Sequence, residues 1–261
     1  MNAIKAVALA IASLVGLLVA VVVGVLLKFK LSSLRNLSRL DQEAPDLLID
    51  GLPFRDLNGN GRLDIYEDFR RPIDERVEDL LGQMTLEEKV GLMMHPIINL
   101  GRQGDLAENP SFTSPLSTSE MVINRHINHF YIVFAKDPQA VAVWYNKLQA
   151  MAERTRLGIP VTLSSDPRHG SQENPGTGMP MPGFSHWPDP LGLAATRDVE
   201  LVERFGDIAR QEYRAIGIRS ALHPMADLAT EPRWARIAGT FGEDAELAAQ
   251  MTAAYIRGFQ G

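Results

Sequence analysis

A twelve-residue stretch, Asp56–Glu67, carries oxygen-bearing side chains at the spacing of a calcium-binding loop. It fits the pattern Asp-x-[Asp/Asn]-x-[Asp/Asn]-Gly followed after five residues by Glu, and Gly61 permits the sharp turn. A hard cation of this kind prefers about six to eight oxygen ligands. The expected ligands are Asp56, Asn58, Asn60, Arg62 through its backbone carbonyl, Asp64 and Glu67. Asn-Gly and Asp are also ordinary turn residues, and no helix is predicted before the loop, so a plain turn is the alternative.

A second cluster, Ser165–Gly170, follows a predicted strand and reads Ser-Asp-Pro-Arg-His-Gly. The carboxyl ends of parallel strands carry the active sites of barrel enzymes. A carboxylate at that position, here Asp166, can accept hydrogen bonds from sugar hydroxyls, which orients a sugar but breaks no bond. Asp-Pro and a terminal glycine suit a plain turn equally well.

A third cluster also follows a strand and comprises His223–Asp227 and Glu231–Arg236. Trp234 lies between Arg233 and Arg236, which together offer a stacking face and fork-shaped hydrogen-bond donors, both useful for binding a sugar. The arginines could instead pair with nearby glutamates and only fix the loop. The residue types alone leave both interpretations open.

The elements that must position these clusters alternate between short apolar strands and longer amphipathic helices. Strands are predicted at residues 130–134, 160–165 and 218–223. Each is followed by a helix, and Asp137, Asp198 and Asp244 stand at the expected helix starts. This βαβαβα order predicts a parallel sheet.

Two helices are predicted before the first of these strands. The first follows Pro72 and carries an apolar stripe of Ile73, Val77, Leu80, Leu81 and Met84. A second begins at the capping box formed by Thr85 and Glu88. It is expected to turn Val90, Met93 and Met94 inward, so we expect the core to begin here.

Three βα units cannot close a barrel. A (β/α)8 barrel takes about 250 residues, whereas the chain offers fewer than 200 from Ile73 onward. The predicted fold is therefore α/β, an incomplete (β/α)8 TIM-barrel-like domain preceded by an N-terminal transmembrane helix. The alternative is a small three-layer α/β domain, complete in itself, whose exposed sheet edge would need a cover.

The N-terminal segment differs in composition from the rest. Ala6–Leu27 is 22 residues without a charge, long enough to cross a bilayer core of about 30 Å. A cleaved signal peptide is the alternative, but the run is long and Leu26–Lys30 offers no small-residue cleavage site. We divide the chain into an anchor at 1–30, a linker at 31–55 and a domain at 56–261.

Overall composition excludes several classes of function. The formal net charge is −6 and the chain has no run of basic residues, so nucleic acid is not an expected partner. The absence of cysteine excludes disulfides and thiolate metal sites.

Taken together, these stretches resemble the family 3 glycoside hydrolases of the β-glucosidase type, in order from Asp56 to Gly261. The similarity is carried by Met84–Val90, Leu157–Gly170 and the Pro-Arg-Trp-x-Arg…Phe-Gly-Glu-Asp segment at 232–244. Residues 256–261 are similar to the helix end that precedes a Lys-His strand in the family. The chain departs from the family pattern at Ala235, where Gly is usual, and at Ser185–Pro188, where Phe-Pro-Gln is common.

The resemblance implies hydrolysis of O-glycosidic bonds at the nonreducing end of β-glucosides by a retaining mechanism in the longer enzyme. It implies substrate binding by Asp166 and Arg236. We count His169 and Arg233 as further substrate-binding residues, with support of the second loop as the alternative role of Arg233. The nucleophile and acid/base of the family match no position here, so we assign no catalytic residue and expect an inactive fragment. Noncatalytic alternatives are a membrane-tethered sugar- or calcium-binding module and a tethered scaffold.

The resemblance also bears on cofactors, partners and location. Calcium is expected only as a structural ion, with no cofactor for catalysis, and a β-linked gluco-oligosaccharide or glucoside is the expected substrate. Lys28, Lys30, Arg35 and Arg39 follow the apolar run, and the positive-inside rule alone would leave the domain in the cytoplasm. Because similar enzymes commonly act outside the cytoplasm, we expect a membrane-anchored domain in the periplasm or at the cell surface.

Overall fold

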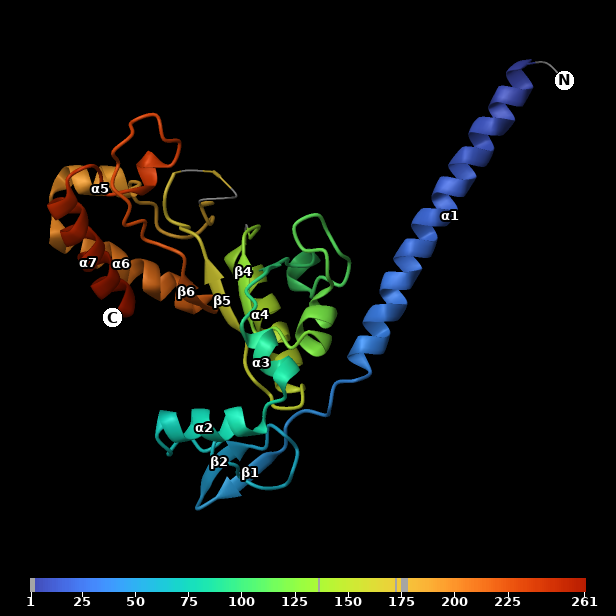
Figure 1. The fold of residues 1–261 in the computed structure, drawn as a ribbon, viewed down its shortest axis with the longest axis horizontal. Coiled ribbons are helices and arrows are strands. Elements are labelled where there is room, and N and C mark those ends of the chain that lie inside the picture. The colour runs from blue at the N-terminus through green and yellow to red at the C-terminus, as the bar shows by residue number, and fades with distance from the viewer. Residues whose placement is uncertain (1–2, 136, 172, 175–177) are drawn as a thin grey trace.

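The computed structural model describes residues 3–135, 137–171, 173–174 and 178–261. A long N-terminal helix stands apart from an α/β body, and a small N-terminal subregion lies below that body in Figure 1. The subregion comprises β1 (Asp46–Ile49), β2 (Leu52–Arg55), α2 (Ile73–Gln83) and α3 (Leu86–Leu92). The body comprises β3 (Ile97–Ile98), η1 (Arg102–Gly104), η2 (Glu120–Asn124), β4 (His129–Ile132), α4 (Pro138–Glu153), β5 (Thr162–Ser165), α5 (Pro190–Thr196), α6 (Val199–Ala215), β6 (Ile218–Ala221), η3 (Ile237–Gly239) and α7 (Ala245–Gln260).

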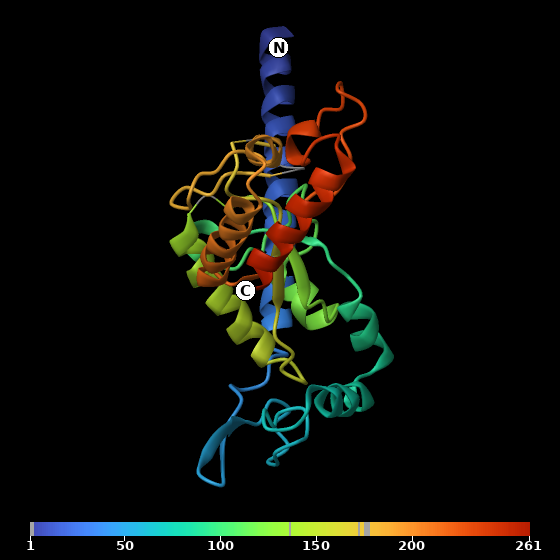
Figure 2. The same cartoon turned by 90° about the vertical axis from the view of Figure 1, so that its left-hand side faces the viewer.

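The central sheet is parallel, with four described strands in the order β3-β4-β5-β6. The register aligns Ile132 with Ser165 and Ser165 with Ala221, so the strands end together at one edge. In Figures 1 and 2 the loops that leave this edge lie at the same end of the molecule. The predicted βαβαβα order is confirmed, but β4 and β6 end two residues earlier than predicted, and His223 therefore lies in a loop.

The helices after the strands begin where the sequence predicts. The Asp137 side chain accepts from the Gln139 amide at 3.0 Å, and Asp198 accepts from the Leu201 amide at 2.9 Å. Asp244 accepts from the amides of Glu246 and Leu247. Each carboxylate satisfies amides that the first helical turn leaves unpaired and also favours the positive end of the helix dipole.

Two apolar clusters hold the body together. One lies against the sheet and includes Phe130, Leu163 and Trp144, all fully buried. The other joins α6 to α7 through side chains that include Phe205 and Tyr255. The two helix backbones approach closely: a Cβ added at Gly258 would lie 1.9 Å from the Glu203 carbonyl oxygen, and one at Gly206 would lie 2.6 Å from that of Tyr255.

The expectation that the core begins at α2 and α3 is wrong. No residue of α2 is buried, and the exposed fractions of Ile73 and Val77 are 74% and 48%. On α3 and just after it, Val90, Met93 and Met94 are exposed as well. The capping box at Thr85 and Glu88 is confirmed, with both hydrogen bonds formed. The helices form as predicted, but most of the α2 stripe is exposed, and of its predicted members only Met84, just after the helix, is buried.

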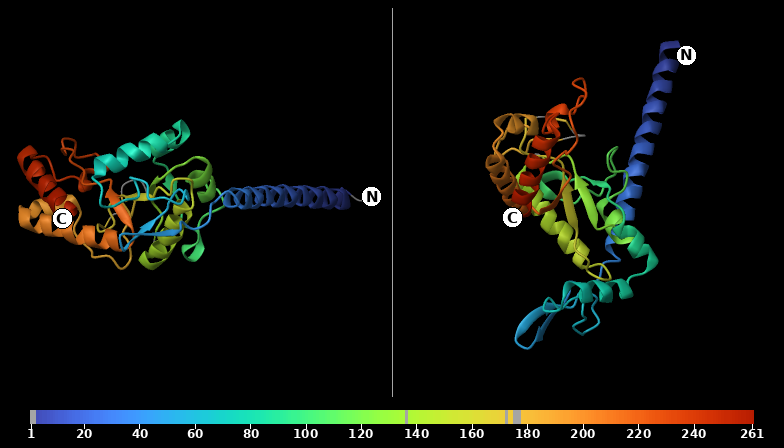
Figure 3. Two further views of the ribbon diagram at one scale, coloured as in Figure 1. Left: turned by 90° about the horizontal axis from the view of Figure 1, so that it is seen from below. Right: turned by 60° about the vertical axis from the view of Figure 1, so that its left-hand side comes forward.

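The N-terminal helix α1 (Ala3–Leu37) continues past the expected anchor boundary at residue 30, and both views of Figure 3 show it projecting from the body. Within it, residues 11–37 are long and apolar enough to cross a membrane by length and composition alone, a test that a signal sequence also passes. The segment interpreted as a linker contains the last turns of α1 and the β1–β2 hairpin. Asn36, in the last turn, is 3% exposed because it packs against η2.

Candidate functional site

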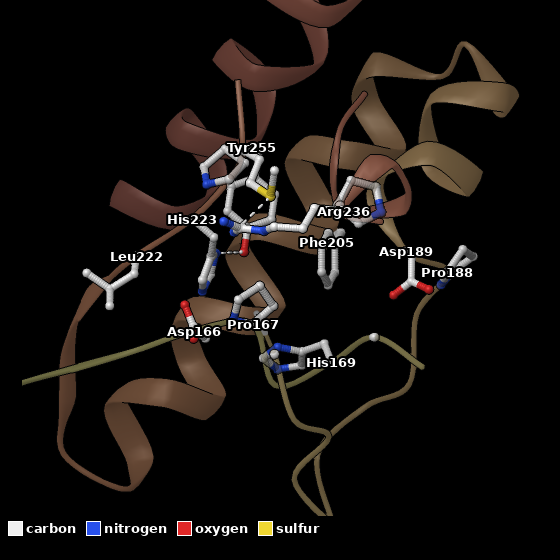
Figure 4. A pocket seen from close by; sticks show the side chains of 16 residues that line it. Asp166, Pro167, His169, Pro188, Asp189, Phe205, Leu222, His223, Arg236 and Tyr255 are labelled. Carbon is white, nitrogen blue, oxygen red and sulfur yellow. Dashed lines mark hydrogen bonds between the residues drawn. The ribbon is translucent and has the colours of Figure 1, made fainter. Parts of the chain in front are cut away.

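A pocket opens at the carboxyl ends of β5 and β6, the edge at which the sequence places both candidate clusters (Figure 4). The loop after β5 contributes Asp166, His169 and Asp189, and the loop after β6 contributes His223 and Arg236. Phe205 of α6 and Tyr255 of α7 complete the wall from the helices behind the sheet. Parallel strands send all their carboxyl ends to one side, which brings residues 70 positions apart to one pocket.

Asp166 is the first residue after β5 and is held from two sides. The hydroxyl of Tyr131, on the neighbouring strand β4, donates to its Oδ2. The hydroxyl of Tyr213 donates to its backbone carbonyl at 2.7 Å. Burial and the Asp166 charge raise the pKa of Tyr131 well above its ordinary value, so this hydroxyl stays a donor. Among the described residues no group donates to Oδ1, which leaves one carboxylate oxygen for a ligand.

His223 lies between two tyrosines, close to Asp166 (Figure 4). Its Nδ1 is 2.7 Å from the Tyr255 hydroxyl and its Nε2 is 3.2 Å from the Tyr213 hydroxyl. Burial, reinforced by the charges of His169 and Arg168, lowers the pKa of His223 to about 3. The ring is therefore neutral at ordinary pH, with one nitrogen donating and the other accepting.

The two candidate arginines occupy different environments. Arg236 lines the pocket, and its Nη2 lies 3.3 Å from the Met225 sulfur. The Arg233 side chain is 88% exposed and pairs with Glu231 at 2.8 Å, outside the pocket wall. Asp166 and Arg236 therefore share one pocket, as expected for residues that bind one sugar, whereas Arg233 supports its own loop.

His169 lines the pocket, but its ring is already engaged. The side chain is 1% exposed, and its Nε2 lies 2.6 Å from Oε2 of Glu212 on α6. The Glu212 carboxylate also accepts from the amide and hydroxyl of Ser185 at 2.9 and 3.0 Å. Ser185 Oγ in turn accepts from the Trp187 indole. His169 therefore ties α6 to the Ser185–Pro188 segment, and this arrangement gives it a role in shaping the pocket wall.

The carboxylates in the described pocket wall are Asp166 and Asp189. Asp189 accepts from the Ser171 amide at 3.2 Å and from the Ser171 hydroxyl at 2.7 Å. Both carboxylates thus accept hydrogen bonds from the protein. We assign neither of them as nucleophile or general acid.

The sequence assignment missed two pocket residues, His223 and Tyr255, and one residue that supports the pocket, Tyr131. Tyr131 belongs to a strand whose side chains alternate, and this alternation indicates that it faces away from Phe130. His223 was noted in its cluster but was placed inside a strand. Tyr255 was counted as an apolar helix position. Helical spacing cannot reveal that its hydroxyl meets a histidine 32 residues away.

The Asp56–Glu67 loop closes on its own backbone. Asp56, 1% exposed, accepts from the amides of Asn60 and Gly61 at 3.0 and 2.7 Å. Glu67 accepts from the amides of Leu57 and Asp64 at 2.7 and 2.9 Å. In the part of the chain that the structure describes, none of the loop's carboxylates pairs with Lys or Arg. No group of three or more His, Asp or Glu side chains there is arranged for a metal ion.

The calcium motif is only partly matched by its surroundings. The element before the loop is the strand β2, not a helix. Gly61, at the glycine position of the motif, has φ 77°, a left-handed conformation that favours glycine. The residue types and the turn fit a calcium ion. The Asn58 and Asn60 amides, however, donate to Asp64 in this structure and would have to turn their oxygens toward an ion.

Comparison with known proteins finds relatives among the glycoside hydrolases. The profile described as "Glycosyl hydrolase family 3 N terminal domain" matches residues 85–261. A "Periplasmic beta-glucosidase/beta-xylosidase" of Dickeya chrysanthemi is 48% identical over 225 residues, which cover 83% of this chain and 33% of that protein. "Beta-glucosidase C" of Emericella nidulans is 48% identical over 200 residues, 76% of this chain and 31% of that protein.

Solved structures agree on the fold. A β-glucosidase involved in saponin metabolism from intestinal bacteria is 29% identical, with a TM-score of 0.51, over 71% of this chain and 21% of that one. A β-glucoside phosphorylase is 19% identical, with a TM-score of 0.58, over 74% of this chain and 31% of that one. The chain spans about a third of the length of the curated relatives it matches. It has a TIM-barrel-like fold and belongs to glycoside hydrolase family 3.

Proposed function

We propose that the chain forms the sugar-binding part of a retaining glycoside hydrolase that cleaves O-glycosidic bonds at the nonreducing end of β-glucosides. The observation that carries this proposal is the shared pocket of Asp166 and Arg236. The Asp166 Oδ1 atom accepts from sugar hydroxyls while Tyr131 holds Oδ2. The guanidinium of Arg236 donates to the same ring. Relatives named β-glucosidase support this class over a noncatalytic module.

Bond cleavage requires groups outside this pocket wall. Retaining hydrolysis uses two carboxyl groups about 5–5.5 Å apart, one as nucleophile and one as acid/base. Tyr131 and Ser171 already hold the two carboxylates here. We therefore infer that this chain binds and orients the sugar, that the longer protein supplies the carboxyl pair, and that the isolated chain is inactive.

Calorimetric titration of the chain with methyl β-glucoside tests the proposal. We expect weak binding that is measurably weaker in Asp166→Asn and in Arg236→Met, because each removes a charge-assisted hydrogen bond to the sugar. Arg233→Met is the matched control, since that side chain is exposed and outside the pocket, and it should bind like the parent chain. Equal losses of affinity in all three variants would refute the sugar site. Hydrolysis of an aryl β-glucoside by the purified chain would refute the inference that the carboxyl pair lies outside it.

We propose that the four-stranded sheet is the first part of a (β/α)8 barrel within a domain spanning residues 56–261 and beyond. A hollow of ≈ 460 Å³ runs along β6 and is lined by Ile218–Ala221, Tyr255 and Phe259. Another parallel strand fits this edge, and the structural relatives, of which this chain covers 21–31%, support such a continuation.

We propose that α1 anchors the domain to a membrane and that the domain lies outside the cytoplasm. The 22-residue uncharged run and the packing of Asn36 against η2 support an anchor that remains part of the folded chain. A relative named periplasmic supports the location. Carbonate extraction of membranes that contain the full chain should leave it in the pellet, and release of a chain shortened by about 27 residues would instead indicate signal cleavage.

We propose that the Asp56–Glu67 loop binds a structural calcium ion. The support is the match of residue types to the calcium motif and the lack of a cationic partner, among the described residues, for Asp56, Asp64 and Glu67. Glu67→Gln should weaken calcium binding because it removes charge from the bidentate ligand. Glu78→Gln, which alters an exposed carboxylate of α2, is the control. Identical titrations of the Glu67 variant and the parent chain would refute the site.

A further inference from the structure

An uncharged loop with an exposed aromatic tip lies beside α1. Residues 109–119 contain no charged side chain. Phe112 has a relative exposure of 103%, and Leu116 in the same loop is also exposed. Figure 1 and the right view of Figure 3 place this loop next to the C-terminal part of α1. A fully exposed phenylalanine costs free energy in water unless another apolar surface covers it.

A buried polar joint couples this loop to α1. The Asn36 Nδ2 atom donates to Ser119 Oγ at 3.3 Å, and the Ser119 amide donates to Glu108 at 3.1 Å, at the base of the loop. Asn36 Oδ1 accepts from the Asn124 amide group at 2.8 Å. Because Asn36 and Ser119 are 3% and 0% exposed, water does not compete for these bonds. The loop and the end of α1 therefore move as one unit.

The sequence of α1 places this joint near one end of the apolar run. That run ends at Leu27, and Lys28 and Lys30 follow, so the C-terminal part of α1 lies where a crossing helix would leave the bilayer. Phenylalanine and leucine side chains insert at the boundary between headgroups and acyl chains, and this loop carries no charge that would have to be desolvated there.

We propose that the loop 109–116 is a second membrane contact, with Phe112 seated in the interface of the bilayer that α1 crosses. The proposal rests on the anchor role of α1 proposed above. In Figures 1 and 2 the loops after β5 and β6 lie toward the same end of the molecule as the N-terminus of α1. The two membrane contacts, α1 and the loop 109–116, hold the face that carries these loops toward the membrane. The pocket therefore takes glycosides presented at a lipid surface.

The absence of cysteine makes a direct test straightforward. The full chain with Phe112→Cys carries an environment-sensitive dye and is reconstituted in phosphatidylcholine vesicles that contain a headgroup-level quencher. Glu78→Cys, on the exposed face of α2, carries the same dye as the control. We expect a blue shift and roughly twofold quenching at position 112, unchanged by high salt because the contact is apolar, and neither effect at position 78.

Two further arms separate the possible failures. The double variant Asn36→Ala/Asn124→Ala, which removes the joint, should lose most of the quenching at position 112 while the protein still floats with vesicles. A chain that floats with vesicles but shows an unshifted, unquenched dye at position 112 would overturn the loop contact and leave the anchor intact. A chain that does not float would overturn the anchor and this proposal together, without bearing on sugar binding by the pocket.

Discussion

The helix pairs α6–α7 and α2–α3 are both amphipathic, yet the apolar stripe is buried in the first pair and largely exposed in the second. On α6, Val202 and Phe205 are buried against α7. On α2, Ile73 and Val77 remain exposed. Both stripes follow the period of a helix, and both pairs form as the sequence predicts. An apolar period therefore predicts a helix and the side it will bury, but only the packing of distant elements decides whether a partner is present.

The largest expected effect comes from deleting a ring on the packed pair. Phe205→Ala should lower the free energy of unfolding by about 3–5 kcal/mol, because it opens a cavity among His169, Trp187 and Tyr255. Val77→Ala, on the exposed stripe, should change it by less than about 0.5 kcal/mol. Urea unfolding in detergent micelles, followed by tryptophan fluorescence, measures both values. Similar losses of unfolding free energy in the two variants would mean that the apolar stripe of α2 is buried.

Two glycine substitutions, one in α7 and one in α2, test the same difference in packing. Gly258→Ala should destabilise the chain by about 1–3 kcal/mol, because its Cβ would meet the backbone of α6. Gly82→Ala, in α2, meets nothing within 4 Å and should stabilise by about 0.5–1 kcal/mol through helix propensity. Effects of the same sign, measured in the same unfolding experiment, would contradict the close approach of α6 and α7.

A third expected effect concerns pH and is specific to the pocket side. The pKa of His223 is lowered to about 3 from its ordinary value of 6.5, so the unfolded chain binds this proton more readily than the folded chain. Its contribution to stability is therefore complete above about pH 6.5 and is lost as the pH falls toward 3. Burial also lowers the pKa of His169, so its contribution to stability is likewise lost as the pH falls.

The check is the free energy of unfolding measured between pH 7.5 and 4, a range chosen to cover the approach to these values. His223→Gln, which keeps a neutral polar side chain, should flatten part of the slope. An NMR titration of His223 supplies an independent readout should that variant be poorly folded. A His223 resonance that titrates near its ordinary pKa would contradict the buried, neutral ring.

Local chemistry in the sequence predicted local structure well. The aspartates at 137, 198 and 244 start the predicted helices, and the capping box at Thr85 forms, because each depends on residues within one turn. The order of strands and helices predicted the parallel sheet, and with it the shared pocket of Asp166 and Arg236.

Features that depend on distant partners escaped prediction. The contacts of Tyr131 with Asp166 and of Tyr255 with His223 join residues more than 30 positions apart. The binding of His169 by Glu212 follows from how α6 packs on the sheet, which no local spacing encodes. The exposure of the apolar stripe on α2 could not be predicted either, since an apolar period in the sequence does not show which element, if any, packs against it.

The central claim is that Asp166 and Arg236 hold one sugar between them, and a double-mutant cycle on methyl β-glucoside binding tests it most directly. Titrations of the parent chain, Asp166→Asn, Arg236→Met and the double variant give the coupling free energy. Because both groups act on one ligand, we expect non-additive losses, with a coupling of about 1 kcal/mol. Losses that add within about 0.3 kcal/mol would mean that the two residues do not act on the same sugar.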